Sequence, residues 1–105
     1  MNPKVGETWF VDFGLAAKPR WAFVVGQAQD ARLAIASVVK ITTEFAGTPY
    51  EVTLPRVPWL REQSYINAQS VQPVKFSELT RKAPGQFDER VLAEVRSALK
   101  NWLRL

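Results

Sequence analysis

The sequence predicts a mainly β fold, in which several short strands form a small barrel and a C-terminal helix packs across it. Two observations lead to this prediction. Up to about residue 75, apolar residues alternate with polar ones or form short runs bounded by glycine and proline, as they do in strands. After residue 90, apolar residues recur every three or four positions, which is typical of a helix with one buried face. At 105 residues, we expect one domain spanning 1–105.

The first strand is predicted from Glu7 to Phe13, because apolar and polar side chains alternate along it. Trp9, Val11 and Phe13 would then lie on one face of the strand. Residues 14–20 follow as a loop that begins with glycine and contains a proline, which disfavours a helix.

Further strands are predicted over Trp21–Val25 and Leu33–Ile41, whose apolar character suggests burial on both faces or a place in a barrel. Shorter strands are predicted over Tyr50–Leu54 and Tyr65–Gln72, and we expect Pro73 to end the second of these. Between them lies an irregular segment that contains several prolines.

The C-terminal helix is predicted from one continuous apolar stripe: Val91, Leu92, Val95, Ala98, Leu99, Trp102 and Leu103. Asp88 stands where an N-cap is expected, and Lys100 and Arg104 suit the negative end of the helix dipole. A brief helical turn can form over Phe76–Lys82. We expect Trp9, Phe23 and Trp102 in the core. We expect Trp59 and Tyr65 to pack as well, although base stacking or a dimer contact is conceivable for both.

Composition excludes several kinds of chemistry. The chain has no histidine and no cysteine, so Ser–His–Asp triads, thiol nucleophiles, disulfides and the usual zinc sites are not available. The ten acidic residues are scattered along the sequence, and the five glycines form no phosphate-binding motif. A net charge of +4 favours an anionic partner.

The sequence also bears on location. Its apolar runs are far shorter than the roughly 20 residues that cross a membrane. The N-terminal segment lacks the apolar stretch of a secretory signal. We therefore expect a cytoplasmic protein with no membrane partner.

The chemistry that remains is one in which the substrate supplies the nucleophile. RNA can do so, because its 2′-OH can attack the adjacent phosphate, and the protein need only align the groups and stabilise negative charge. Arg20, followed some 20 residues later by Thr42 and Thr43, supplies suitable donors. Such a pair also occurs in many binding domains, so the pattern alone does not select catalysis.

The order of these segments resembles the MazF/PemK family of bacterial toxins. The segment Gly6-Glu7-Thr8-Trp9-Phe10-Val11-Asp12-Phe13 is similar to the family's first strand. Arg20 precedes the next strand, as the family's arginine does, and Val38–Thr43 is similar to the family strand that ends in threonine. Asn67–Gln72 is similar to the segment that lines the family's RNA groove. The resemblance extends from about Val5 to Leu103.

This resemblance implies an SH3-like β-barrel of the MazF/CcdB type. It implies a toxin that acts as a sequence-selective endoribonuclease, or mRNA interferase, without a metal or cofactor. The substrate would be single-stranded RNA, and the products would carry 2′,3′-cyclic phosphate and 5′-OH ends. The resemblance also implies a homodimer and a cognate antitoxin that fills the RNA groove.

The resemblance further implies the site residues. Arg20 and Thr42 would be the catalytic pair, with Thr43 as the alternative threonine. Because an arginine remains protonated, we expect Arg20 to stabilise charge and donate a proton rather than accept one. Substrate-binding roles are implied for Lys18, Thr43, Asn67, Gln69 and Gln72.

The chain departs from the family pattern at three points. Trp21 replaces the usual proline after Arg20, the loop before Arg20 is short, and Gln69 stands where an acidic residue is common.

Other interpretations stay open for the same residues. Arg20 could form a salt bridge with Asp12 or Glu44, and the amides between residues 67 and 72 could be the polar face of a strand. A different class of protein is a CcdB-like toxin that inhibits a topoisomerase by binding. Such a protein needs exposed apolar residues on its terminal helix, whereas we expect the stripe here to be buried. A third possibility is a nucleic-acid-binding barrel without catalytic activity.

Overall fold

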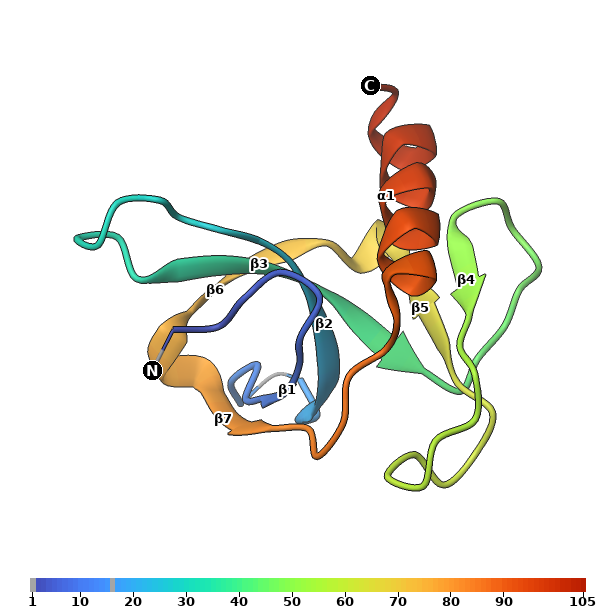
Figure 1. Cartoon of the computed structure of the whole chain (residues 1–105), viewed down its shortest axis with the longest axis horizontal. Coiled ribbons are helices and arrows are strands. Elements are labelled where there is room, and N and C mark those ends of the chain that lie inside the picture. Colours follow the sequence, from blue (N-terminus) through green and yellow to red (C-terminus); the bar gives the residue numbers. More distant parts are fainter. Residues whose placement is uncertain (1, 16) are drawn as a thin grey trace.

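The computed structural model describes residues 2–15 and 17–105, and over these residues seven β-strands precede one α-helix (Figure 1). The elements are β1 (Thr8–Val11), β2 (Arg20–Gln27), β3 (Ile35–Thr42), β4 (Glu51–Thr53), β5 (Tyr65–Asn67), β6 (Gln72–Lys75), β7 (Leu79–Lys82) and α1 (Glu89–Leu103). Two one-turn 3₁₀ helices, η1 (Ala68–Ser70) and η2 (Phe76–Glu78), flank β6. Position 16, in the predicted loop 14–20, lies outside the described residues.

The strands form one antiparallel sheet in the order β4-β5-β3-β2-β1-β7, and β6 also pairs with β3. Across the described part of the chain the two end strands, β4 and β7, do not pair with each other, so the sheet curls without closing. The predicted mainly β fold with a C-terminal helix is confirmed, and the word barrel applies to it only loosely.

Two apolar clusters lie on opposite faces of the central strands. Along β2, Phe23 points into the cluster under α1, whereas Ala22 and Val24 point into the cluster enclosed by β1, β6 and β7. Along β3, Val39 and Val38 divide in the same way. This period of two explains why β2 and β3 are apolar almost throughout, as a strand buried on both faces must be. Trp9 and Phe23 are core residues, 6% and 1% exposed, as predicted.

The prediction of one strand over Tyr65–Gln72 is wrong. The segment divides into β5 and the start of β6, separated by η1, whose first turn is capped by the Asn67 side chain accepting from the Gln69 backbone N–H at 3.0 Å. Pro73 lies inside β6, opposite Ser37, rather than ending a strand. Proline is tolerated there because β6 pairs only with β3 in the described structure, so its missing N–H can face away from the ladder.

The turn predicted over Phe76–Lys82 is half right. Its first residues form η2, but Leu79–Lys82 form β7, which pairs with β1.

Helix α1 begins as predicted and is buried less completely than predicted. The Asp88 side chain accepts a hydrogen bond from the Val91 backbone N–H at 3.3 Å, which makes it the N-cap. Val91 and Val95 are buried against the sheet, but Trp102 is 40% exposed. The prediction that Trp102 is a core residue is therefore wrong. The C-terminal end of α1 extends past the sheet (Figure 1), where the main aromatic contact of Trp102 is edge-to-face with Tyr50 at 5.3 Å between ring centroids.

In the described residues, no helix has the length and apolar character needed to cross a membrane.

Candidate functional site

The antiparallel pairing of β2 and β3 brings Arg20 and Thr42 to the same end of the sheet. The ladder between these strands ends with the pair Ala22 and Lys40. Arg20 begins β2 and Thr42 ends β3, and each lies two residues beyond that pair. Residues 20 and 42, far apart in the sequence, therefore lie at one end of the same two strands.

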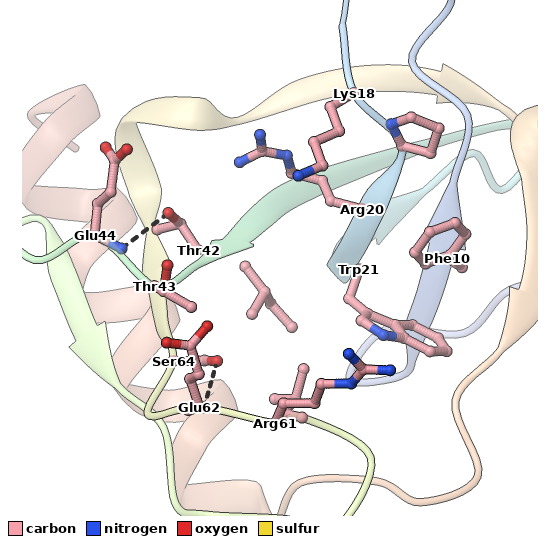
Figure 2. Close-up of a pocket in the computed structure, with 13 residues that line it drawn as sticks. Phe10, Lys18, Arg20, Trp21, Thr42, Thr43, Glu44, Arg61, Glu62 and Ser64 are labelled. Carbon is pink, nitrogen blue, oxygen red and sulfur yellow. Dashed lines mark hydrogen bonds between the residues drawn. The ribbon is translucent and has the colours of Figure 1, made fainter.

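A pocket of about 400 Å³ opens at this end of the two strands, and we call it the Arg20 pocket. Its lining residues are Phe10, Lys18, Pro19, Arg20, Trp21, Ile41, Thr42, Thr43, Glu44, Leu60, Arg61, Glu62 and Ser64. Figure 2 shows Lys18 and Arg20 reaching from one side toward Thr42 and Thr43 on the other. Four of the residues implied by the resemblance, Lys18, Arg20, Thr42 and Thr43, therefore line one pocket.

An adjoining pocket of about 410 Å³, the Asn67 pocket, shares three lining residues with the first: Arg20, Thr42 and Glu44. The others are Lys40, Phe45, Ala46, Glu51, Asn67 and Ser70. Arg20 and Thr42 thus lie on the boundary between two pockets, where an extended ligand can contact them from both sides. Gln69 is exposed and Gln72 half-buried, and neither lines either pocket.

The two threonines differ in their contacts. The Thr42 side-chain Oγ1 accepts a hydrogen bond from the Glu44 backbone N–H at 3.1 Å, which fixes the hydroxyl oxygen (Figure 2). Its own O–H proton remains available, because a hydroxyl can accept and donate together. Thr43 is exposed, one position beyond the strand. Thr42 also lines both pockets together with Arg20, whereas Thr43 lines only the first.

Arg20 is half-buried and pairs with no carboxylate of the described residues. The salt bridges considered for it, to Asp12 or Glu44, are not formed. The Asp12 carboxylate instead accepts from the Gly14 backbone N–H at 2.9 Å. The Arg20 guanidinium therefore has its charge and donors available for an anion in the pocket.

Sequence reasoning missed Arg61 and Glu62 of the Arg20 pocket and considered Glu44 only as a salt-bridge partner of Arg20. Arg61 and Glu62 belong to the irregular segment between β4 and β5, and Glu44 follows β3 directly. The acidic residues looked scattered in the sequence, but Glu44 and Glu62 line the same pocket, which corrects that interpretation. No local pattern marks these residues, because the loop that carries two of them reaches the pocket only through the tertiary fold.

Within the described ranges, no group of three or more aspartate, glutamate, histidine or cysteine side chains is placed to hold a metal ion. The donors that converge on the Arg20 pocket are instead cations and hydroxyls: Lys18, Arg20, Thr42, Thr43 and Arg61. Such a set suits a phosphate group.

Comparison with known proteins places this geometry in context. The model of the family described as PemK-like, MazF-like toxin of type II toxin-antitoxin system matches residues 4–103. Comparison with curated protein sequences gives no match.

Solved structures share the fold. An endoribonuclease in complex with its cognate antitoxin, from a mycobacterial species, has 22% identity and a TM-score of 0.83, covering 98% of this chain and 96% of that one. MazF from Deinococcus radiodurans has 23% identity and a TM-score of 0.82, covering 100% and 99%. The Mycobacterium tuberculosis toxin MazF-mt6 has 22% identity and a TM-score of 0.78, covering 94% and 97%. At these identities the structures establish a common fold.

The family match covers every strand of the sheet and α1, including both strands that carry Arg20 and Thr42. The chain therefore belongs to the family of PemK-like, MazF-like toxins of type II toxin-antitoxin systems.

Proposed function

We propose that this chain is an endoribonuclease toxin that cleaves single-stranded RNA, an mRNA interferase, with the scissile phosphate bound between Arg20 and Thr42. The observation that carries the proposal is that Arg20 and Thr42 lie together at the boundary of two adjoining pockets. Arg20 forms no ion pair with a carboxylate of the described residues, and the Thr42 hydroxyl is oriented by the Glu44 backbone. Family membership supports it, since neighbours with this fold are endoribonucleases.

In the proposed reaction the ribose 2′-OH attacks the adjacent phosphorus. The O2′–P bond forms, the P–O5′ bond breaks, and the products carry a 2′,3′-cyclic phosphate and a 5′-OH. Negative charge grows on the non-bridging oxygens, where the Arg20 guanidinium and the Thr42 hydroxyl can donate hydrogen bonds. Lys18 adds positive potential at the same pocket.

Two protons must move in this reaction. One leaves O2′, and Glu44 and Glu62 are the carboxylates of the pocket that can accept it. One must reach the leaving O5′, and we assign this donation to the Arg20 guanidinium.

The proposed reaction needs no metal ion or cofactor, because positive charge and nucleophile are supplied by the protein and the RNA. Incubation of the purified protein with a mixed RNA in excess EDTA should leave cleavage intact. Mapping of the ends should find 5′-OH and 2′,3′-cyclic phosphate termini. Loss of cleavage on chelation, restored by magnesium, would show that the mechanism is wrong.

We further propose that the protein acts as a homodimer in the cytoplasm, where its mRNA substrate is found. Its partner is a cognate antitoxin, like the one bound to the mycobacterial neighbour. An acidic and apolar antitoxin segment would suit pockets lined by Lys18, Arg20 and Phe45.

A second candidate is a binding toxin of the CcdB type that inhibits a topoisomerase. The exposure of Trp102 and Leu103 at the end of α1 favours it, because such binding needs apolar residues on the terminal helix. Failure to cleave any RNA, together with topoisomerase inhibition that is lost on Trp102→Ala substitution, would favour this function instead.

A further inference from the structure

Three neighbouring strands place a row of aromatic and basic side chains beside the Arg20 pocket, and we call this row of Phe10, Trp21 and Arg81 the ladder. In the sheet register, Phe10 of β1 pairs with Trp21 of β2 on one side and with Arg81 of β7 on the other. Paired residues share a face of the sheet, so the three side chains meet. The Phe10 and Trp21 rings contact edge-to-face at 5.2 Å, and the Arg81 guanidinium carbon lies 5.4 Å and 5.2 Å from their respective centroids.

A second tryptophan extends the ladder. Trp59, from the irregular segment after β4, contacts Trp21 edge-to-face, with 5.4 Å between the ring centroids. Its ring also packs against that of Phe87, again with 5.4 Å between the centroids. Both tryptophans are half-buried, so part of each indole remains open to solvent.

A pocket of about 560 Å³ opens beside the two tryptophans, and we call it the Trp59 pocket. Its lining residues are Trp21, Trp59, Arg61, Arg81, Lys82 and Pro84. Trp21 and Arg61 also line the Arg20 pocket, so the two pockets adjoin. In the view of Figure 2, the Arg61 side chain extends toward the Trp21 ring, on the side away from Arg20.

The charge of the Trp59 pocket is positive and largely uncompensated. Lys82 is engaged, because its Nζ lies 2.9 Å from the Glu7 carboxylate. Arg61 and Arg81 are exposed and form no ion pair with the described residues. No acidic residue is among the side chains that line this pocket in the described structure, whereas Glu44 and Glu62 line the Arg20 pocket.

We infer that the Trp59 pocket binds one nucleotide of the RNA next to the scissile phosphate, with the base against the indoles of Trp21 and Trp59 and its phosphate against Arg61 and Arg81. This inference rests on the proposed function. Tryptophan faces bind bases of any sequence by stacking, and arginine adds charge and cation–π attraction. The volume suits a small planar ligand.

Binding can be measured without cleavage. A short, fully 2′-O-methylated single-stranded RNA of mixed sequence has no free 2′-OH, so it tests the pocket separately from the proposed reaction. The wild-type protein should bind it with quenching of tryptophan fluorescence. Trp102→Phe should retain this quenching, because Trp102 lies at the far end of α1.

Arg81→Gln and Arg61→Gln should each weaken this binding about 5- to 20-fold, as loss of a charged phosphate contact does. The slope of log affinity against log salt should also become shallower by about 0.7 for each. The matched control is Arg96→Gln, on the exposed side of α1, which removes the same charge outside this pocket. It should change neither quantity appreciably.

Trp59→Phe keeps a ring against Phe87 and should weaken binding less than Trp59→Leu, whose melting temperature must be measured beside its affinity. On a cleavable RNA, Arg81→Gln should raise KM and leave kcat near the wild-type value.

Three results would overturn the inference. The first is that Arg61→Gln and Arg81→Gln bind the methylated RNA as tightly as Arg96→Gln does. The second is that they lower only the melting temperature, which would make the ladder structural. The third is that they weaken binding of a short polyglutamate peptide but not of RNA, which would make the pocket a protein-docking surface. Absence of cleavage by the wild-type protein, with RNA binding intact, would instead contradict the proposed function alone.

Discussion

At the scale of single residues, the proposed chemistry depends most on Arg20. Arg20→Ala should abolish RNA cleavage, and Thr42→Ala should lower kcat, because removing one donor to a developing oxyanion commonly costs about 10²–10³ in rate. Arg20→Lys should recover little activity, since lysine lacks the planar two-point contact. Neither Arg20 nor Thr42 belongs to the buried apolar core, so melting temperatures should stay near the wild-type value.

The control for these variants is Thr53→Ala, which removes an exposed strand threonine of β4 that lines neither pocket. It should cleave at the wild-type rate. Wild-type cleavage by Arg20→Ala would show that the active site lies elsewhere.

Glu7 is the residue that should link stability to pH. Its carboxylate is buried, and it accepts from the Lys4 backbone N–H at 2.8 Å and from the Trp9 indole N–H at 3.1 Å, with Lys82 Nζ 2.9 Å away. Burial raises the pKa of Glu7, but the hydrogen bond from Lys82, followed by those from Lys4 and Trp9, outweighs it, so the pKa lies below its ordinary value of 4.5. Folding therefore favours the ionised form.

The sign of the pH effect follows. The stabilisation from Glu7 is fully present above pH 4.5 and is lost as pH falls through the lower folded-state pKa. Glu7→Gln should lower the free energy of unfolding at pH 7 by about 1–3 kcal/mol. The difference from wild type should shrink at pH 3 in urea titrations. Glu94→Gln, which breaks only an exposed pair with Arg90, should show little change at either pH. An equal deficit for Glu7→Gln at both pH values would contradict this account.

At the scale of elements, α1 divides into a buried part and an exposed end. Val95→Ala removes two methyl groups from a fully buried position and should cost about 2–3 kcal/mol. Trp102→Ala should cost less, about 1–2 kcal/mol, because the indole is 40% exposed and loses mainly its contact with Tyr50. Urea unfolding of the two variants checks the order. A larger loss for Trp102→Ala would mean that its exposed face is covered in the folded protein, for example in a dimer.

Local patterns predicted the elements whose period is visible along the chain. The alternation predicted from Glu7 to Phe13 marks β1, and the apolar stripe marks the buried face of α1, so the sequence alone reveals both elements. Strand β7 was missed because Leu79 is its single apolar residue, and its strand geometry comes from pairing with β1. The break between β5 and β6 was not predicted from the sequence. Both segments pair with β3 in the fold, and the short helix η1 that separates them depends on the cap formed by the Asn67 side chain.

The candidate site likewise combines residues that the sequence marks with residues that only the tertiary fold brings to the pocket. Arg20 and Thr42 were predicted as partners from the resemblance, and the antiparallel pairing of β2 and β3 places them at the same end of the sheet, where both line the two pockets. Arg61 could not be predicted, because the segment after β4 has no periodicity that fixes where it lies. The ladder of Phe10, Trp21 and Arg81 likewise requires the sheet order, which joins the first and the last strands of the chain.

At the scale of the whole molecule, the composition constrains the source of the nucleophile. All 105 residues lack histidine and cysteine, so thiol nucleophiles and hydroxyl nucleophiles activated by a histidine are missing. The positive groups around Arg20 can stabilise a charged phosphate but cannot themselves attack it. We therefore expect the attacking oxygen to come from the RNA, and the 2′-OH is the group within reach of its own phosphate.

This expectation is tested by replacing one atom of the substrate. Once the cleavage position has been mapped, an RNA with deoxyribose at that position alone should bind with nearly unchanged affinity and remain intact, because the attacking oxygen is gone. The same substitution one nucleotide to the 3′ side should leave cleavage near its normal rate, since that sugar takes no part in bond formation. Competition between labelled and deoxy-substituted RNA measures the binding, and denaturing gels measure the cleavage. Continued cleavage at the deoxy position, leaving a 5′-phosphate, would mean that water attacks instead, and Glu44 and Glu62 would then be the first residues to test as its general base.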